Sequence, residues 1–170
     1  NIQGYDSPLL ETLSWNYTGN FSYRNALKSL FATASYTYGK FRSNLLYSYS
    51  FDASGATIFE AVPDENFSNT HTMSLRGSKY FTGVNTSLSL GGHFSLRDSQ
   101  QLLNSVPTDI RSKALQFDLK VDSEITSWFS LNYKSEFSFY KSLFGDQKSD
   151  WIKSSKHIVD LSFYLFQNQY

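Results

Sequence analysis

The chain has 170 residues, enough for one domain, and its 15 basic and 15 acidic residues give a formal net charge of zero. This balance predicts no nucleic-acid surface, which would need a basic patch, and the lack of cysteine excludes a disulfide scaffold, a thiolate metal site and a cysteine nucleophile. Aromatic residues make up 18% of the chain, and it lacks the run of about 18 apolar residues that a transmembrane helix needs.

The first predicted strand follows a loop over residues 1–10. Apolar side chains from Leu13 to Tyr23 alternate there with serine, threonine and asparagine. A period of two indicates a strand with one apolar and one polar face. After a short turn, the same alternation returns over residues 30–38, and Gly39 marks a candidate turn at its end.

The spacing of the connections bears on this candidate turn. Short connections near Asn25, Thr82 and Thr126 alternate with long polar segments at residues 52–69, 98–111 and 141–157. Outer-membrane barrels have short periplasmic turns and longer outer loops, and a turn at Gly39 would break that alternation. One solution is that Gly39 forms no turn and residues 28–51 form one long, bulged strand, which leaves about seven strands. A turn at residues 39–42 stays open as the alternative.

Residues 111–140 carry the clearest pattern, two alternating strands around a break at residues 125–127, as in a β-hairpin. One row is apolar and is predicted to face lipid: Leu115, Phe117, Leu119, Val121, Phe129, Leu131, Phe137 and Phe139. The other row is too charged for a dry core and is predicted to line a water-filled lumen: Asp118, Lys120, Asp122, Lys134 and Glu136. Each strand has roughly the 9–11 residues that a tilted strand needs to cross a bilayer.

The three tryptophans are candidates for a membrane-interface belt. Trp15 and Trp128 lie at or near strand ends, and Trp151 lies in the last long loop, before a final apolar row over residues 159–165. An indole ring suits the level of the lipid headgroups. Together these features predict an all-β fold, an antiparallel transmembrane β-barrel meander of seven or eight strands. Residues 1–170 would form one outer-membrane β-barrel segment without a second domain, as part of a larger barrel.

The sequence offers little for catalysis or metal binding. His71, His93 and His157 fall on separate predicted elements without HxH or HxxxH spacing, and no GxSxG, Walker A or GxGxxG motif is present. We therefore predict no metal site, no cofactor and no enzymatic activity.

The aromatic alternation resembles the later barrel strands of TonB-dependent receptors of the Bacteroidota type. The resemblance lies in Trp15-Asn16-Tyr17, in Ser35-Tyr36-Thr37-Tyr38 and in the run from Thr126 to Tyr133. It implies the wall of a large plugged barrel of about 22 strands in the outer membrane of a Gram-negative bacterium. It further implies nutrient import with capture by outer loops, and as partners membrane lipid, a plug domain, a TonB-type energising complex and a surface lipoprotein. Neither the plug nor the TonB-contacting segment has a counterpart here, so we expect a segment of a longer polypeptide.

Two other functions remain open. A complete small barrel of eight strands would have a structural or adhesive role and a filled polar interior. A soluble β-barrel or sandwich that binds an apolar ligand would turn the apolar rows inward and the charged rows to solvent. Periodicity does not distinguish inside from outside, and the membrane interpretation depends on aromatic content, strand length and the tryptophans.

Overall fold

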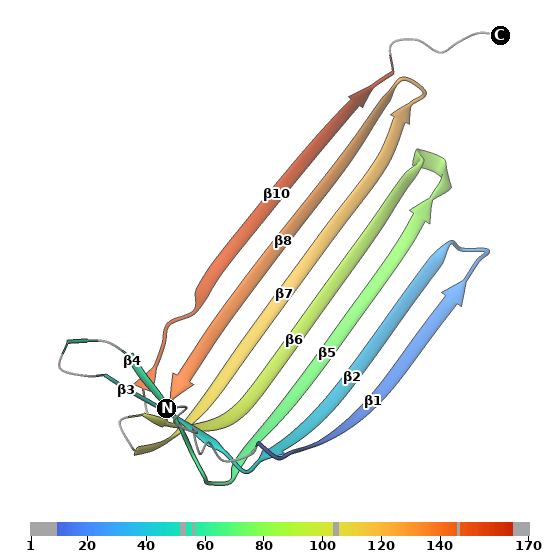
Figure 1. Cartoon of the computed structure of the whole chain (residues 1–170). Helices are drawn as coiled ribbons and strands as arrows, with labels where there is room; N and C mark the ends of the chain where they lie inside the picture. Colours follow the sequence, from blue (N-terminus) through green and yellow to red (C-terminus); the bar gives the residue numbers. More distant parts are fainter. Residues whose placement is uncertain (1–9, 52–53, 56, 104–105, 146, 165–170) are drawn as a thin grey trace, which may run out of the picture.

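The computed structural model describes residues 10–51, 54–55, 57–103, 106–145 and 147–164. Most of these residues lie in a single antiparallel sheet (Figure 1). Its main path runs through β1 (Thr12–Asn25), β2 (Leu30–Ser43), β5 (Asn66–Phe81), β6 (Thr86–Leu103), β7 (Val106–Thr126), β8 (Phe129–Phe144) and β10 (Ile152–Phe163). Off this path lie β3 (Leu46–Phe51), β4 (Thr57–Val62) and β9 (Gln147–Lys148). The predicted all-β antiparallel meander of long strands is confirmed.

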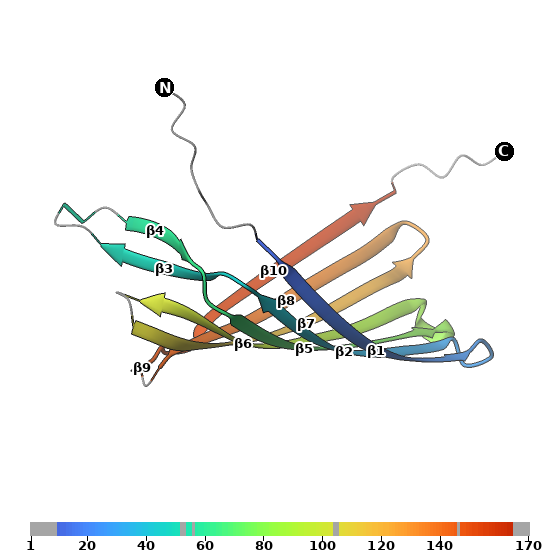
Figure 2. The same ribbon diagram turned by 60° about the horizontal axis from the view of Figure 1, so that its bottom comes forward.

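The sheet is curved but open. Along the main path every strand pairs antiparallel with its neighbours, whereas β1 pairs only with β2 and β10 only with β8 among the described residues. These two strands are the edges of the sheet, at its right and left sides in Figure 1, and Figure 2 shows the curvature of the sheet between them. The described chain therefore does not close into a barrel.

The register aligns the apolar positions of neighbouring strands with one another, and likewise their polar positions, so the sheet has two continuous faces. Directly opposite residues in a sheet project from the same face. One row across the sheet is almost wholly apolar: Phe21, Ala34, Leu75, Gly92, Phe117 and Phe137. The adjacent row is wholly polar: Asn20, Ser35, Ser74, His93, Gln116 and Ser138. We call these two sides the apolar face and the polar face.

The described chain has almost no core of its own. Its buried hydrophobic residues are Leu45, just before β3, and Leu46, the first residue of β3. By contrast, Tyr17 and Phe21 on the apolar face are 64% and 62% exposed. The aromatic side chains of this face are thus left uncovered by the described residues.

The two ends of the strands differ. At one end, the turn end, the connections are short: residues 26–29, the 3₁₀ helix η1 (Thr82–Val84) and residues 127–128. The turns predicted near Asn25, Thr82 and Thr126 are therefore confirmed. At the other end, the loop end, β3 and β4 form a hairpin, and β3 pairs in parallel with the end of β6 (Figure 1). No helix in the described part of the chain is long and apolar enough to cross a membrane.

Four predictions for the loop end need correction. Gly39 lies inside β2 and forms no turn, but the expected single strand over residues 28–51 ends at Ser43. Residues 52–69 contain β4 and the start of β5 rather than only a loop. Residues 98–111 are largely paired, because β6 and β7 continue far past the apolar row. Residues 141–157 are also largely strand instead of loop, because β8 extends to Phe144, β9 covers Gln147–Lys148 and β10 begins at Ile152.

Candidate functional site

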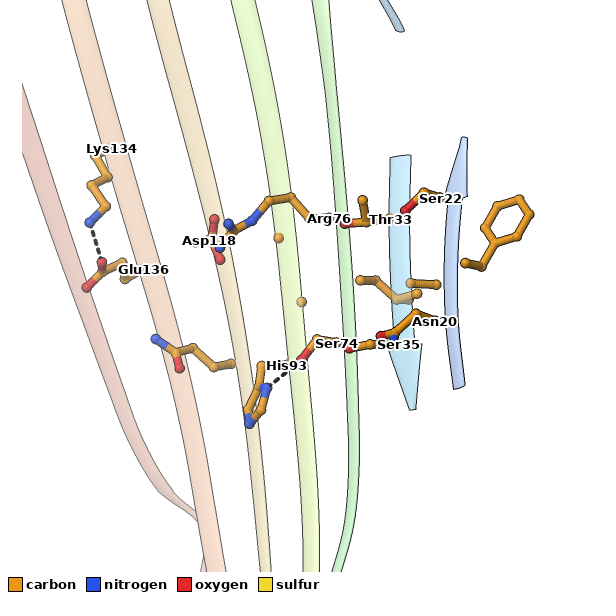
Figure 3. Close-up of a pocket in the computed structure, with 16 residues that line it drawn as sticks. Asn20, Ser22, Thr33, Ser35, Ser74, Arg76, His93, Asp118, Lys134 and Glu136 are labelled. Carbon is orange, nitrogen blue, oxygen red and sulfur yellow. Dashed lines mark hydrogen bonds and ion pairs between the residues drawn. The ribbon is translucent and has the colours of Figure 1, made fainter. Parts of the chain in front are cut away.

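The polar face contains a hollow of about 760 Å³ (Figure 3). Six strands, from β1 to β8 along the main path, contribute to it. The polar side chains at its wall include Asn20, Ser22, Thr33, Ser35, Ser74, Arg76, His93, Gln116, Asp118, Lys134 and Glu136. The hollow therefore combines hydroxyl, amide, carboxylate and cationic groups on one face of the sheet.

The five residues predicted to line a lumen all lie on this polar face, on β7 and β8. Asp118 is opposite Glu136, and Lys120 is opposite Lys134. Two lysines directly opposite each other repel. Here each has an acid two residues further along its own strand: Lys120 Nζ lies 2.8 Å from Asp122 Oδ2, and Lys134 Nζ lies 2.6 Å from Glu136 Oε1. The charges on the polar face are thus locally balanced.

Gly91 lets two charged side chains approach each other across β6. The register puts Gly91 opposite Arg76 on one side and opposite Asp118 on the other. Figure 3 shows the Arg76 side chain reaching over β6 toward Asp118. A Cβ atom at Gly91 would overlap the Asp118 carboxylate. A glycine in a strand often marks such a close approach.

A hydroxyl and an imidazole also meet in the hollow. A hydrogen bond of 2.9 Å joins Ser74 Oγ and His93 Nδ1. The residue opposite His93 on β7 is Gln116, so this pair lacks there the carboxylate that orients the imidazole in a catalytic triad. The arrangement suits hydrogen bonding to a polar ligand.

The eight residues predicted to face lipid lie together on the apolar face. Leu115 is opposite Phe139, and Phe117 is opposite Phe137. The remaining four continue the same face toward the turn end: Leu119, Val121, Phe129 and Leu131. No charged side chain lies within these rows on β7 and β8. The nearest charged residues on the same face are Lys113 and Lys141, one row beyond Leu115 and Phe139.

The tryptophans lie at both ends of the apolar face. Trp15, on β1, is opposite Lys40 near the loop end. Trp128 is at the turn end, where its ring lies 6.0 Å from that of Phe129 and 6.5 Å from that of Phe163. Trp151 precedes β10 at the loop end. The three tryptophans therefore lie near the two ends of the strands.

The histidines are dispersed. His71 and His157 lie on the apolar face, and each Nδ1 shares a hydrogen bond with a tyrosine hydroxyl, that of Tyr36 (2.8 Å) and that of Tyr133 (3.0 Å). Such bonds satisfy polar groups on an otherwise apolar surface. Within the described ranges, no group of three or more histidine or acidic side chains could hold a metal ion.

Beyond the apolar rows, the same face becomes charged toward the loop end. Arg111 Nε donates a hydrogen bond of 2.5 Å to Asp98 Oδ1, and this bond raises the pKa of Arg111 above its ordinary value. The side chain of Arg42 forms an ion pair with Glu65 in the same region.

Sequence reasoning did not single out Arg76, Gly91 or His93 as site residues. Each stands at a polar position of an alternating strand, and many other residues do as well. Only the register shows that Arg76 and Asp118 flank the same glycine.

Comparison of the chain with models of known protein families, with curated proteins and with solved structures finds no match.

Proposed function

We propose that this sheet is part of the transmembrane wall of an outer-membrane β-barrel, with the apolar face toward lipid and the polar face toward a water-filled lumen. The observation that carries the proposal is a single-layer sheet whose aromatic face has no cover among the described residues. A soluble sheet would bury such a face against a second layer. A bilayer would cover it instead.

The height of the apolar face fits a bilayer. Phe129 and Phe139 are ten positions apart on β8, which is about 34 Å along a strand at about 3.4 Å per residue. With a tilt of about 40°, that length spans about 26 Å along the membrane normal, close to the apolar band of about 25 Å in outer-membrane barrels. Tryptophans at both borders add the expected girdle.

The curvature favours a polar interior. The hollow lies on the polar face and draws on six strands, as the concave side of a barrel wall would. A soluble barrel that binds an apolar ligand needs the apolar rows on the inside, and this arrangement argues against it.

The two edges support a larger barrel rather than a small one. Six antiparallel steps separate β1 from β10, so these strands run in the same direction. Pairing them with each other would create a parallel contact, whereas outer-membrane barrels are antiparallel. In lipid no open edge is tolerated. Both edges would therefore need neighbours that run the opposite way.

The narrower proposal is a TonB-dependent nutrient importer of a Gram-negative outer membrane. Its support is the resemblance of the aromatic strands, together with a polar wall that offers hydrogen bonds to a passing ligand. Outer loops at the loop end, including the hairpin of β3 and β4, would capture the ligand. A plug domain, an energising complex and a surface lipoprotein would be its partners.

Spin labelling tests the orientation of the faces. The chain has no cysteine, so Leu119→Cys and Asp118→Cys each give a single labelling site on neighbouring positions of β7. In vesicles, we expect the label at position 119 to be accessible to oxygen and the label at 118 to a water-soluble nickel chelate. The reverse pattern would overturn the proposed orientation.

A growth assay tests the importer proposal separately. A deletion strain would be supplied with chelated iron, cobalamin or glycans as the limiting nutrient. We expect a defect with one of these classes, and the same defect when the energising complex is removed. Normal growth on all of them would contradict the importer proposal and leave the membrane assignment intact.

A further inference from the structure

Two lysines stand directly opposite each other at the loop-end border of the apolar face. The register pairs Lys113 on β7 with Lys141 on β8. Both are half-buried, and both lie one row beyond the predicted lipid-facing pair Leu115 and Phe139. Like charges at directly opposite positions destabilise a sheet unless something neutralises them.

A third lysine belongs to the same cluster. Lys153 on β10 is opposite Phe139, so it is the diagonal neighbour of Lys141 on the same face. Diagonal neighbours are close enough for long side chains to reach one another. The Lys141 ammonium also lies 5.8 Å from the centre of the Trp151 ring. We call Lys113, Lys141 and Lys153 the lysine cluster.

Among the described residues, the lysine cluster lacks the acidic partners that neutralise the other opposed lysines. On the polar face, the opposed pair of Lys120 and Lys134 is neutralised by acids on the same strands. On the apolar face, Asp98 is engaged by Arg111, and Asp109 accepts a hydrogen bond from Gln100. The ion pairs of the described chain are Arg42–Glu65, Arg111–Asp98, Lys120–Asp122 and Lys134–Glu136, and none includes the cluster.

We propose that the lysine cluster binds the phosphate groups of a phosphorylated lipid in the leaflet around the loop end. Three lysines at neighbouring positions of one face would supply the positive charge and the hydrogen-bond donors that bind a phosphate. The apolar rows directly below the cluster would take the acyl chains of the same molecule. Because the lysine cluster adjoins the apolar rows, a lipid could use both surfaces, whereas a free phosphate ion would use only the lysines. The inference rests on the proposed orientation of the apolar face.

The test compares two bilayers. The full-length polypeptide is reconstituted into phosphatidylcholine vesicles and into the same vesicles doped with lipid A, and the lipid retained around the protein is measured by native mass spectrometry. We expect lipid A to be enriched around the protein. A surface lysine contributes about 1 kcal/mol to binding of an anionic lipid, which corresponds to about fivefold in affinity per lysine. The triple variant K113Q/K141Q/K153Q should therefore lose roughly one hundredfold.

A matched control removes the same charge elsewhere. The variant K28Q/K79Q/K156Q changes three lysines at the turn end or on the polar face and should retain lipid A. The variant K113R/K141R/K153R keeps the charge and should also retain it, so a folding defect in the glutamine variant would not decide the result. Flotation with neutral vesicles checks insertion for every variant.

The outcomes separate the two proposals. Insertion into both bilayers without enrichment of lipid A, or equal loss in the control variant, would overturn the lipid site alone. Displacement of lipid A by millimolar inorganic phosphate would point to a free-anion site and would also overturn it. Failure to insert into either bilayer would overturn the proposed membrane wall, and the lipid site with it.

Discussion

At the scale of single residues, the surroundings of Gly91 predict how a substitution there changes the stability of the protein. A methyl group there would occupy the space of the Asp118 carboxylate and force that side chain away from Arg76. Overpacking in a dense core costs about 1–3 kcal/mol, but the half-exposed Asp118 carboxylate can rotate into the open hollow, so the cost here lies near the lower limit of about 1 kcal/mol. We therefore expect Gly91→Ala to lower the free energy of unfolding by that amount, measured by urea denaturation of the full-length polypeptide in lipid.

A thermodynamic cycle isolates the cause. In an Asp118→Ala background the clash is absent, so Gly91→Ala should become neutral or stabilise by about 0.5–1 kcal/mol, the ordinary gain of alanine over glycine in a strand. Gly92→Ala is the matched control, because its Cβ would lie at an ordinary 3.7 Å from Phe117 Cδ1. An equal loss in both backgrounds would show that Asp118 is not responsible.

Ser135 is a second residue whose contacts predict whether its replacement by alanine raises or lowers the free energy of unfolding. It is 1% exposed, and its hydroxyl oxygen has no hydrogen-bond partner among the described residues. An unsatisfied buried polar group costs about 1–3 kcal/mol. We expect Ser135→Ala to raise the free energy of unfolding by about 1 kcal/mol, measured by the same denaturation.

The control for Ser135 is Ser138, which is exposed on the polar face of the same strand. Its replacement by alanine should change stability by less than about 0.5 kcal/mol. A clear loss of stability in Ser135→Ala would mean that the hydroxyl is satisfied in solution.

At the scale of strands, the alternating rows could be predicted, but the lengths of the strands could not. Over residues 115–121 and 129–139 one face is apolar, so a period of two is visible in the sequence. Near Asp98 and Arg111 both faces of the sheet are polar, and alternation vanishes although pairing continues. Gly39 was ambiguous for a different reason. A Cβ there would lie 2.9 Å from Oδ1 of Asn16, which is directly opposite on β1, so the glycine reflects a close approach between β1 and β2 and not a turn.

For single strands, we predict how the turn end of the edge strand β10 is stabilised. Its turn end is held by a ring cluster in which Trp128 and Phe129 contact Phe163. Aromatic pairs contribute about 0.5–1.5 kcal/mol beyond the area they bury. We expect Trp128→Ala to reduce the hydrogen-exchange protection of amides in residues 159–163 by about 1 kcal/mol.

Trp15→Ala is the comparison for this measurement, because Trp15 lies on the other edge strand near the loop end. It should leave the protection of residues 159–163 unchanged. The same loss in both variants would indicate a general effect on the sheet instead of a local clamp on β10.

At the scale of the whole molecule, sequence alone could predict two faces but not the site that the polar face forms. Assigning Asp118 and Glu136 to the polar side needed only the alternation. The hollow needed the register, because Arg76 and Asp118 are far apart in sequence and meet only through the pairing of β5, β6 and β7. Curvature is likewise a property of the assembled sheet, which no single strand encodes.

The two open edges supply the last prediction, which concerns closure. Because β1 and β10 run in the same direction, we expect them to have different neighbours in the folded protein, not each other. Cysteine pairs that join Thr18, Asn20 or Ser22 of β1 to Ser154 or Lys156 of β10 should therefore not form disulfides on oxidation. The positive control is S112C/S142C, whose native hydroxyl oxygens lie 3.4 Å apart on paired strands, within disulfide reach. Efficient linkage of β1 to β10 would mean that these strands close on themselves through a parallel contact, which would favour a small barrel over a segment of a larger one.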